Sequence, residues 1–96
     1  MIYSFEWDTD KAKTNLMKHD VSFEDAASIF RDPKALTLFD DSHSEDEERW
    51  ITFGLSSSGK LLVVNHTFKE IDSRKCIIRI FSSRKANKSE AKQYGE

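Results

Sequence analysis

Hydrophobic positions in the first third of the chain recur with a helical period, which predicts two short helices. Asp8 or Thr9 can cap a first helix that runs to about His19. The second helix begins after Ser22, carries apolar residues at i, i+3, i+4 and i+7, and stops at Asp32-Pro33. Because very few residues separate the two helices, we predict a helix hairpin.

The rest of the chain places apolar residues at every second position, which predicts β-strands. We expect a short strand at residues 5–7 before the helices and four strands after them. These four strands are expected at residues 35–39, 49–56, 61–68 and 76–83. Asn87-x-x-Glu90 then caps a short C-terminal helix. The predicted order of elements is β-α-α-β-β-β-β-α.

These elements predict an α+β fold in a single domain, residues 1–96. A chain of this length buries about 65% of its unfolded surface, which is enough for one core without metal or disulfide support. Connections of hairpin length favour a small antiparallel sheet with the helix hairpin on one face. Much of the other face is then open to a ligand or a partner.

Composition excludes several kinds of protein. The longest apolar run, Leu61–Val64, is too short to span a membrane, and residues 1–10 lack the layout of a signal peptide. Cys76 is the only cysteine, so an internal disulfide and a cysteine-cluster zinc site are excluded. We therefore expect a cytoplasmic protein that does not contact membranes.

Charge is distributed unevenly along the chain. The net charge of −2 by itself argues weakly against a nucleic-acid-binding protein. Residues 1–50 carry a net −7, from six basic and thirteen acidic side chains, whereas residues 51–96 carry a net +5, from nine and four. This asymmetry indicates either a basic surface on an acidic protein or ordinary solvation.

Arg79 is the most informative residue of the last predicted strand. It lies between isoleucines at mid-strand, where a guanidinium group needs a counter-ion or a groove. It either pairs with a carboxylate such as Glu48 or forms a phosphate clamp, since guanidinium groups bind phosphate oxygens two at a time. Arg84 and Lys85 follow at the strand end, and Arg49 opens an earlier strand. These residues are candidates for an anion site.

Histidine supplies the candidate groups for proton transfer. His66 is either a structural histidine or an acid–base group beside the arginines. In the first helix, Lys11, Asn15 and His19 lie four positions apart and share one face, which is either solvated or functional. His43 lies in an acidic loop, and we interpret it as solvated. The spacing of the histidines matches no metal-ligand pattern, so we expect no metal site.

Several short motifs occur in a specific order along the chain. They are Phe5-Glu6-Trp7-Asp8, Lys11, Asn15, Lys18-His19, Val21-Ser22-Phe23-Glu24, Ala26-Ala27, Asp32-Pro33, Glu48-Arg49, Gly54-Leu55-Ser56, Ile78–Ala86, Glu90 and Tyr94. Their order and spacing resemble the BrnT family of toxins from residue 5 to residue 94. The chain departs from that pattern at Asp20, where glycine is usual, and at Asn87-Lys88-Ser89, which replaces a more basic stretch.

The resemblance implies a small bacterial ribonuclease toxin of a type II toxin–antitoxin module, with a RelE-like fold. It implies RNA as the substrate and a BrnA-like ribbon-helix-helix antitoxin as the partner, with DNA contacted only through that antitoxin. The alternative is a non-catalytic binding protein, or co-repressor, that acts through a DNA-binding partner.

Cleavage of RNA by its own 2′-hydroxyl needs a base, an acid and cationic donors for the charged phosphorane, but no metal or cofactor. The candidate catalytic residues are Arg79, Arg84 and Arg49 for the phosphate, His66 or His19 for the proton, and Glu48 as a base or orienting group. The candidate RNA contacts are Lys11, Trp7 and Lys85. For Trp7 a core anchor is the alternative to base stacking.

Overall fold

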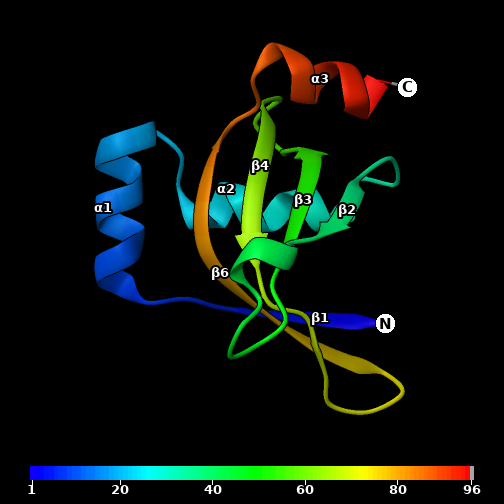
Figure 1. The fold of residues 1–96 in the computed structure, drawn as a ribbon. Coiled ribbons are helices and arrows are strands. Elements are labelled where there is room, and N and C mark those ends of the chain that lie inside the picture. The colour runs from blue at the N-terminus through cyan, green and yellow to red at the C-terminus, as the bar shows by residue number, and fades with distance from the viewer. Residues whose placement is uncertain (96) are drawn as a thin grey trace.

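A computed structural model describes residues 1–95 as one mixed sheet flanked by helices (Figure 1). The helices and 3₁₀ turns are α1 (Thr9–His19), α2 (Phe23–Ser28), η1 (Ile29–Arg31), η2 (Asp41–His43) and α3 (Lys88–Gly95). The strands are β1 (Ile2–Glu6), β2 (Leu36–Phe39), β3 (Trp50–Leu55), β4 (Leu61–His66), β5 (Lys69–Glu70) and β6 (Lys75–Lys85). The predicted α+β class is confirmed, and the element order differs from the prediction by the short strand β5.

The sheet is mixed rather than purely antiparallel, which corrects the prediction. Its strand order is β1-β6-β4-β3-β2, with β5 paired to the first part of β6. All neighbouring strands are antiparallel except β1, which runs parallel to β6. Hairpin connections determine direction only for strands that follow one another in the chain. The partner of β1 comes some 70 residues later, so no local turn sets its direction.

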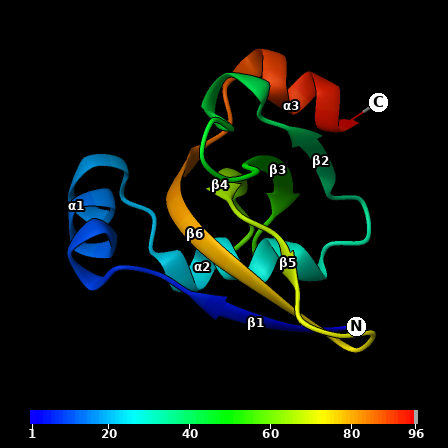
Figure 2. The ribbon, with the colours of Figure 1, turned by 60° about the horizontal axis from the view of Figure 1, so that its bottom comes forward.

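The two N-terminal helices do not lie side by side as a hairpin. In Figures 1 and 2, α1 runs along the outer side of β6, whereas α2 crosses behind the strands. The connection is short, as predicted, but Asp20 adopts a left-handed conformation with φ 56° and turns the chain sharply after α1.

No helix in residues 1–95 is both long and apolar enough to cross a membrane.

The helix starts follow the predicted capping residues. The Asp8 carboxylate accepts from the backbone N–H groups of Asp10 and Lys11, which satisfies two of the free donors at the start of α1. Ser22 accepts from the backbone N–H of Asp25 at the start of α2. For α3, Asn87 and Glu90 exchange side chain to backbone bonds of 2.8 and 2.9 Å. All three caps are therefore confirmed.

The core lies between α2 with η1 and one face of the sheet. The residues fully buried there are Val21, Phe23, Ala26 and Ile29 from the helical side, and Leu62, Val64, Cys76, Ile78 and Ile80 from the strands. Cys76 packs as a small apolar residue, and burial raises the pKa of its thiol. Gly54 lies so close that an added Cβ would approach the Ile29 Cβ to 2.8 Å. The glycine thus lets η1 approach β3 closely.

Helix α3 closes one end of the sheet (Figure 1). The Tyr94 hydroxyl donates to the Asp32 carboxylate, which also accepts from the Leu55 backbone N–H at 2.8 Å. Partial burial works against ionisation of Asp32, but the bonds from Leu55, Tyr94 and Lys34 hold its pKa below the usual value. Asp32 therefore connects the end of the helical segment, β3 and α3.

Candidate functional site

A β-bulge in β6 decides which of its side chains share a face. The pairing between β4 and β6 skips one residue, Phe81. Without the bulge, Arg79 and Arg84 would point to opposite faces, because they are five positions apart and strand side chains alternate. With the bulge, both lie on the face turned away from α2 and the core. The local sequence carries no turn residue that would predict this irregularity.

Three cationic groups surround the Phe81 ring on that face. The Arg49 guanidinium carbon lies 4.3 Å from the ring centroid, and the Arg79 guanidinium carbon lies 5.8 Å from it. The Lys11 Nζ atom is 5.5 Å from the same centroid. These distances are in the range of cation–π interactions. We call these four residues the Phe81 cluster; its cations come from α1, from the residue before β3, and from β6.

Helix α1 is held at this position by one buried polar side chain. The Asn15 amide nitrogen donates to the backbone oxygens of Val21, at 3.0 Å, and Ser83, at 2.8 Å, and its oxygen accepts from the Ser83 N–H at 3.0 Å. Lys11 lies one helical turn before Asn15, so this anchor places it beside Phe81. On the face of α1 that Lys11, Asn15 and His19 were predicted to share, Asn15 is therefore a structural anchor and Lys11 is a cation beside Phe81.

No cation of the Phe81 cluster has a hydrogen-bonded carboxylate partner within residues 1–95. Arg79 is exposed and forms no ion pair within residues 1–95. Arg49 forms one ion pair within the described residues, with Glu47 at 3.8 Å, which is too long for a hydrogen bond, and its charge also helps to lower the pKa of Asp40. Asp8 lies near enough that Lys11 and Arg79 add to the lowering of its pKa, which is caused first by the backbone N–H bonds. The cluster is thus suited to bind an anion.

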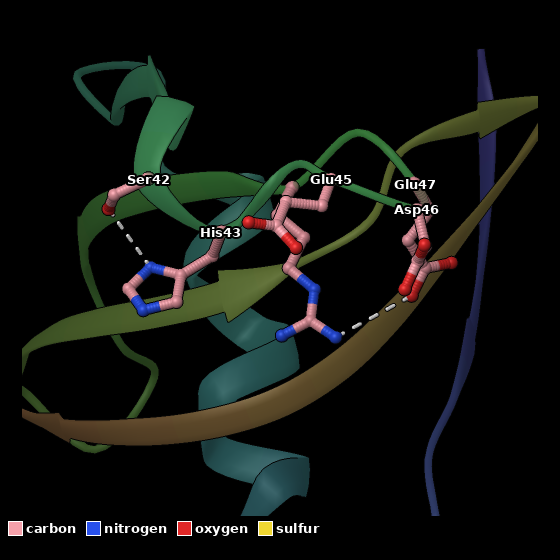
Figure 3. Close-up of a pocket in the computed structure, with 6 residues that line it drawn as sticks. Ser42, His43, Glu45, Asp46 and Glu47 are labelled. Atoms are coloured by element: carbon pink, nitrogen blue, oxygen red, sulfur yellow. Dashed lines mark hydrogen bonds and ion pairs between the residues drawn. The ribbon is translucent and has the colours of Figure 1, made fainter.

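A cleft of about 380 Å³ adjoins the Phe81 cluster. Its lining residues are Asp40, Ser42, His43, Arg49, Ile51, Asn65, Phe81 and Ser82. A second hollow of about 320 Å³ shares Ser42, His43 and Arg49 with it and is bordered by Glu45, Asp46 and Glu47. Figure 3 shows His43 and Ser42 on one side of this second hollow, and Asp46 and Glu47 on the other. We call the first hollow the Phe81 cleft.

The loop that carries His43 is closed at its base. The Asp40 N–H donates to the Arg49 backbone oxygen at 2.8 Å, which extends the β2–β3 hairpin by one pair. Ser44 Oγ donates to the Asp40 backbone oxygen and accepts from the Arg49 N–H at 3.0 Å. His43 Nδ1 lies 3.0 and 3.1 Å from the two Asp40 carboxylate oxygens. Sequence reasoning missed this pair, because it interpreted His43 only as part of a solvated acidic loop.

Arg84 does not join the Phe81 cluster, although it lies on the same face. Its two terminal nitrogens donate to the two Glu90 oxygens at 2.7 and 2.8 Å. This pair raises the pKa of Arg84 and, for the same reason, lowers the pKa of Glu90. The clamp of Arg79 and Arg84 that the sequence suggested is therefore not formed.

His66 lies in the core, on the opposite face of the sheet from Arg79. It is buried, its Nδ1 donates to the Thr67 backbone oxygen at 2.9 Å, and its Nε2 accepts from the Thr52 hydroxyl at 2.7 Å. Burial lowers its pKa, although the bond to Thr67 acts in the other direction. The interpretation of His66 as a structural histidine is thus confirmed, and its position beside the arginines is wrong, because the covered face of β4 carries it.

The remaining predicted site residues are dispersed. His19 is exposed two turns beyond Lys11, which is about 12 Å along the helix axis. Trp7 is half-buried, with its ring 5.9 Å from that of Phe23, so it anchors the core. Lys85 is exposed at the end of β6, and Glu48 is exposed in the acidic loop. In the part of the chain that the structure describes, no three potential metal ligands lie together.

A family model described as "Ribonuclease toxin, BrnT, of type II toxin-antitoxin system" matches residues 7–90. The chain belongs to the BrnT family. Its fold is similar to the 1.1 Å crystal structure of the Brucella abortus ribonuclease toxin BrnT, with a TM-score of 0.60 and 22% sequence identity. That match covers 92% of this chain and 100% of the other. No curated protein shows a significant sequence match.

The BrnT family consists of ribonuclease toxins of type II toxin–antitoxin systems, so membership in it implies an antitoxin partner. Seven of the chain's motif residues form two groups in the structure. One group holds α3 in place: Asp32, Arg84, Glu90 and Tyr94. The other contributes cations to the Phe81 cluster: Lys11, Arg49 and Arg79. The departure from the BrnT pattern at Asp20 coincides with the left-handed residue after α1. The RelE-like description remains a prediction.

Proposed function

We propose that this BrnT-family protein is an endoribonuclease that cleaves RNA at the Phe81 cluster without a metal ion. The observation that carries the proposal is the convergence of Lys11, Arg49 and Arg79 on one aromatic ring beside a cleft. A volume of about 380 Å³ is within the range of small-ligand sites, so one nucleotide can enter the cleft.

The cluster supports transesterification by the chemistry of its charges. The 2′-hydroxyl oxygen of a nucleotide attacks the adjacent phosphorus, the bond to the 5′-oxygen breaks, and a 2′,3′-cyclic phosphate forms. Negative charge accumulates on the phosphorane oxygens, and the Arg49 and Arg79 guanidinium groups are placed to stabilise it. Lys11, whose Nζ atom lies 5.5 Å from the centroid of the same ring, binds a flanking phosphate as a point charge.

We further propose that a BrnA-like ribbon-helix-helix antitoxin neutralises the toxin by covering the Phe81 cluster. Two features support this: the cluster is open to solvent at Arg79, and its net positive charge can attract an acidic segment of a partner. DNA is then contacted through the antitoxin rather than through this chain. Protection of Arg79 and Lys11 from chemical modification in the complex tests the proposal, and unchanged reactivity of both residues contradicts it.

Purified protein incubated with single-stranded RNA in EDTA tests the nuclease activity. Cleavage is expected to leave 2′,3′-cyclic phosphate and 5′-hydroxyl ends. Arg79→Ala and Arg49→Ala are each expected to lower kcat/KM about 100-fold or more, because each removes a donor to the developing charge. Arg31→Ala is the matched control, since it removes the same charge from an exposed position on η1.

The same assay distinguishes the nuclease from a non-catalytic co-repressor. Intact RNA, together with tight binding of a DNA-binding partner, contradicts the nuclease and favours the co-repressor. Cleavage that stops in EDTA and returns with a divalent ion contradicts the metal-independent mechanism. Equal activity of Arg79→Ala, Arg49→Ala and the Arg31→Ala control contradicts the location of the site.

A further inference from the structure

We infer that His43 is the general base of RNA cleavage and that Asp40 orients its imidazole. This inference rests on the proposed function, because it assigns a role within the same site. His43 lines the Phe81 cleft together with Phe81 and Arg49. It is the one histidine that the structure places there, since His66 lies in the core and His19 lies further along α1.

The geometry of the pair determines which ring nitrogen is available. Nδ1 lies 3.0 and 3.1 Å from the Asp40 oxygens and 3.2 Å from Ser42 Oγ. An Nδ1–H that donates to the carboxylate leaves Nε2 as an acceptor, which is the tautomer a general base requires. Asp40 would also stabilise the imidazolium that forms when Nε2 takes up a proton.

Asp40 is well positioned to hold the imidazole, because its own backbone is held by the hairpin. Its N–H and C=O are both bonded, to the Arg49 backbone oxygen and to Ser44 Oγ. Its side chain is 12% exposed, whereas that of His43 is 67% exposed. Partial burial opposes ionisation of Asp40, but the bonds from His43 and Ser42 keep its pKa below the usual value. The carboxylate is thus fixed and charged, and the imidazole projects toward solvent.

Stability does not explain the pair. A histidine–carboxylate pair whose imidazole is largely exposed contributes little to folding free energy, because solvent screens the interaction. His43 packs against no aromatic ring in residues 1–95, unlike His66, whose ring lies 4.9 Å from that of Phe30. The arrangement of an orienting carboxylate, a solvent-facing imidazole and a neighbouring guanidinium is instead typical of acid–base catalysis on phosphate esters.

The step can be written with its proton accounted for. His43 Nε2 removes the proton from the 2′-hydroxyl while the 2′-oxygen bonds to phosphorus. The bond from phosphorus to the 5′-oxygen breaks, and that oxygen takes a proton from water. His43 then returns its proton to solvent. The charged groups around the imidazole are Asp40, Glu45, Asp46, Glu47 and Arg49.

The test begins with the full chain, RNA and the pH dependence of cleavage. His43→Gln is expected to lower kcat about 10²- to 10⁴-fold and to remove the acidic limb of the pH–rate profile. Affinity for an RNA with a 2′-deoxy nucleotide at the cleavage point is expected to stay within about twofold, because the base acts in the chemical step. The melting temperature is expected to be unchanged, since His43 is exposed.

Asp40→Asn tests the positioning role. It is expected to lower kcat by less than His43→Gln does and to leave KM within about twofold, because the imidazole loses the acceptor that orients it while the contacts to RNA remain. Asp41→Asn is the matched control, since it removes the same charge from the next residue, which is exposed. If Asp41→Asn lowers kcat as much as Asp40→Asn does, the specific role of Asp40 is contradicted.

A substrate with sulfur in place of the 5′-bridging oxygen separates a base from an acid. Sulfur leaves without protonation, so the His43→Gln defect is expected to persist if His43 is the base. Recovery of the variant on this substrate makes His43 the acid and overturns the inference. If wild-type protein cleaves RNA and His43→Gln cleaves it equally well, the inference fails alone. If wild-type protein cleaves no RNA, the inference and the proposed function fail together.

Discussion

Arg84 and Glu90 form a bidentate ion pair that joins the end of β6 to α3, with nitrogen to oxygen distances of 2.7 and 2.8 Å. Glu90 also accepts from the Asn87 N–H, so one carboxylate both caps the helix and binds the guanidinium. Arg84, which the sequence suggested as a catalytic residue, therefore holds the C-terminal helix in place. Arg79, five residues earlier, has no such partner in residues 1–95 and remains with the Phe81 cluster.

The Arg84–Glu90 pair is expected to contribute to stability rather than to cleavage. Arg84→Ala should lower the free energy of unfolding by about 1 kcal/mol, a value reduced for the partial exposure of the arginine. A double-mutant cycle with Glu90→Gln, followed by urea unfolding, measures the coupling. At temperatures where Arg84→Ala is folded, its cleavage rate should stay close to wild type. Loss of cleavage by the folded variant, as with Arg79→Ala, would place Arg84 in the site after all.

The hydroxyl of Tyr94 is expected to hold α3 against the rest of the fold. Tyr94→Phe should lower the urea midpoint, because Asp32 loses one of the donors that keep it ionised in the folded state. Tyr3→Phe is the matched control, since the Tyr3 hydroxyl makes no hydrogen bond in the described part of the chain. Equal midpoints for the two variants would show that the Tyr94–Asp32 bond adds nothing.

His66 is expected to make the fold sensitive to mild acid. Burial lowers its pKa in the folded state, so below about pH 6.5 the unfolded chain binds a proton that the folded chain does not. The free energy of unfolding should therefore fall as the pH decreases from 8 to 5.5, with a slope that approaches about 1.4 kcal/mol per pH unit. Urea unfolding at several pH values measures this slope. His66→Gln should flatten it, and His19→Gln should leave it unchanged.

Asp20 is expected to destabilise the end of α1. Its φ of 56° is unfavourable for a residue with a Cβ, and its negative charge lies at the negative end of the helix dipole. Asp20→Gly should raise the free energy of unfolding by about 1 kcal/mol. Asp20→Asn isolates the charge, because asparagine tolerates the left-handed conformation as aspartate does. If Asp20→Gly is no more stable than Asp20→Asn, the left-handed backbone conformation does not destabilise the end of α1.

Local features of the fold could be predicted from the sequence because each depends on residues close together in the chain. The caps at Asp8, Ser22 and Asn87 involve partners within three positions, and all three were predicted. Apolar alternation predicted a strand at residues 76–83, and β6 (Lys75–Lys85) contains it. Arg49 and Arg79 were predicted as phosphate contacts and Lys11 as an RNA contact, and these three do come together, although their roles remain proposals.

The sequence alone determined the class of the main helices and strands, the caps that start the helices and the supply of cationic side chains, because backbone propensity and hydrogen bonding within a few residues decide them. Tertiary structure decided the rest. The bulge at Phe81, the parallel pairing of β1 and the covered face of β4, which buries His66, depend on contacts between distant segments. The Asp40–His43 pair faces the cleft because strand pairing brings Asp40 next to Arg49. Such contacts depend on the packing of the whole chain, which a local sequence pattern does not specify.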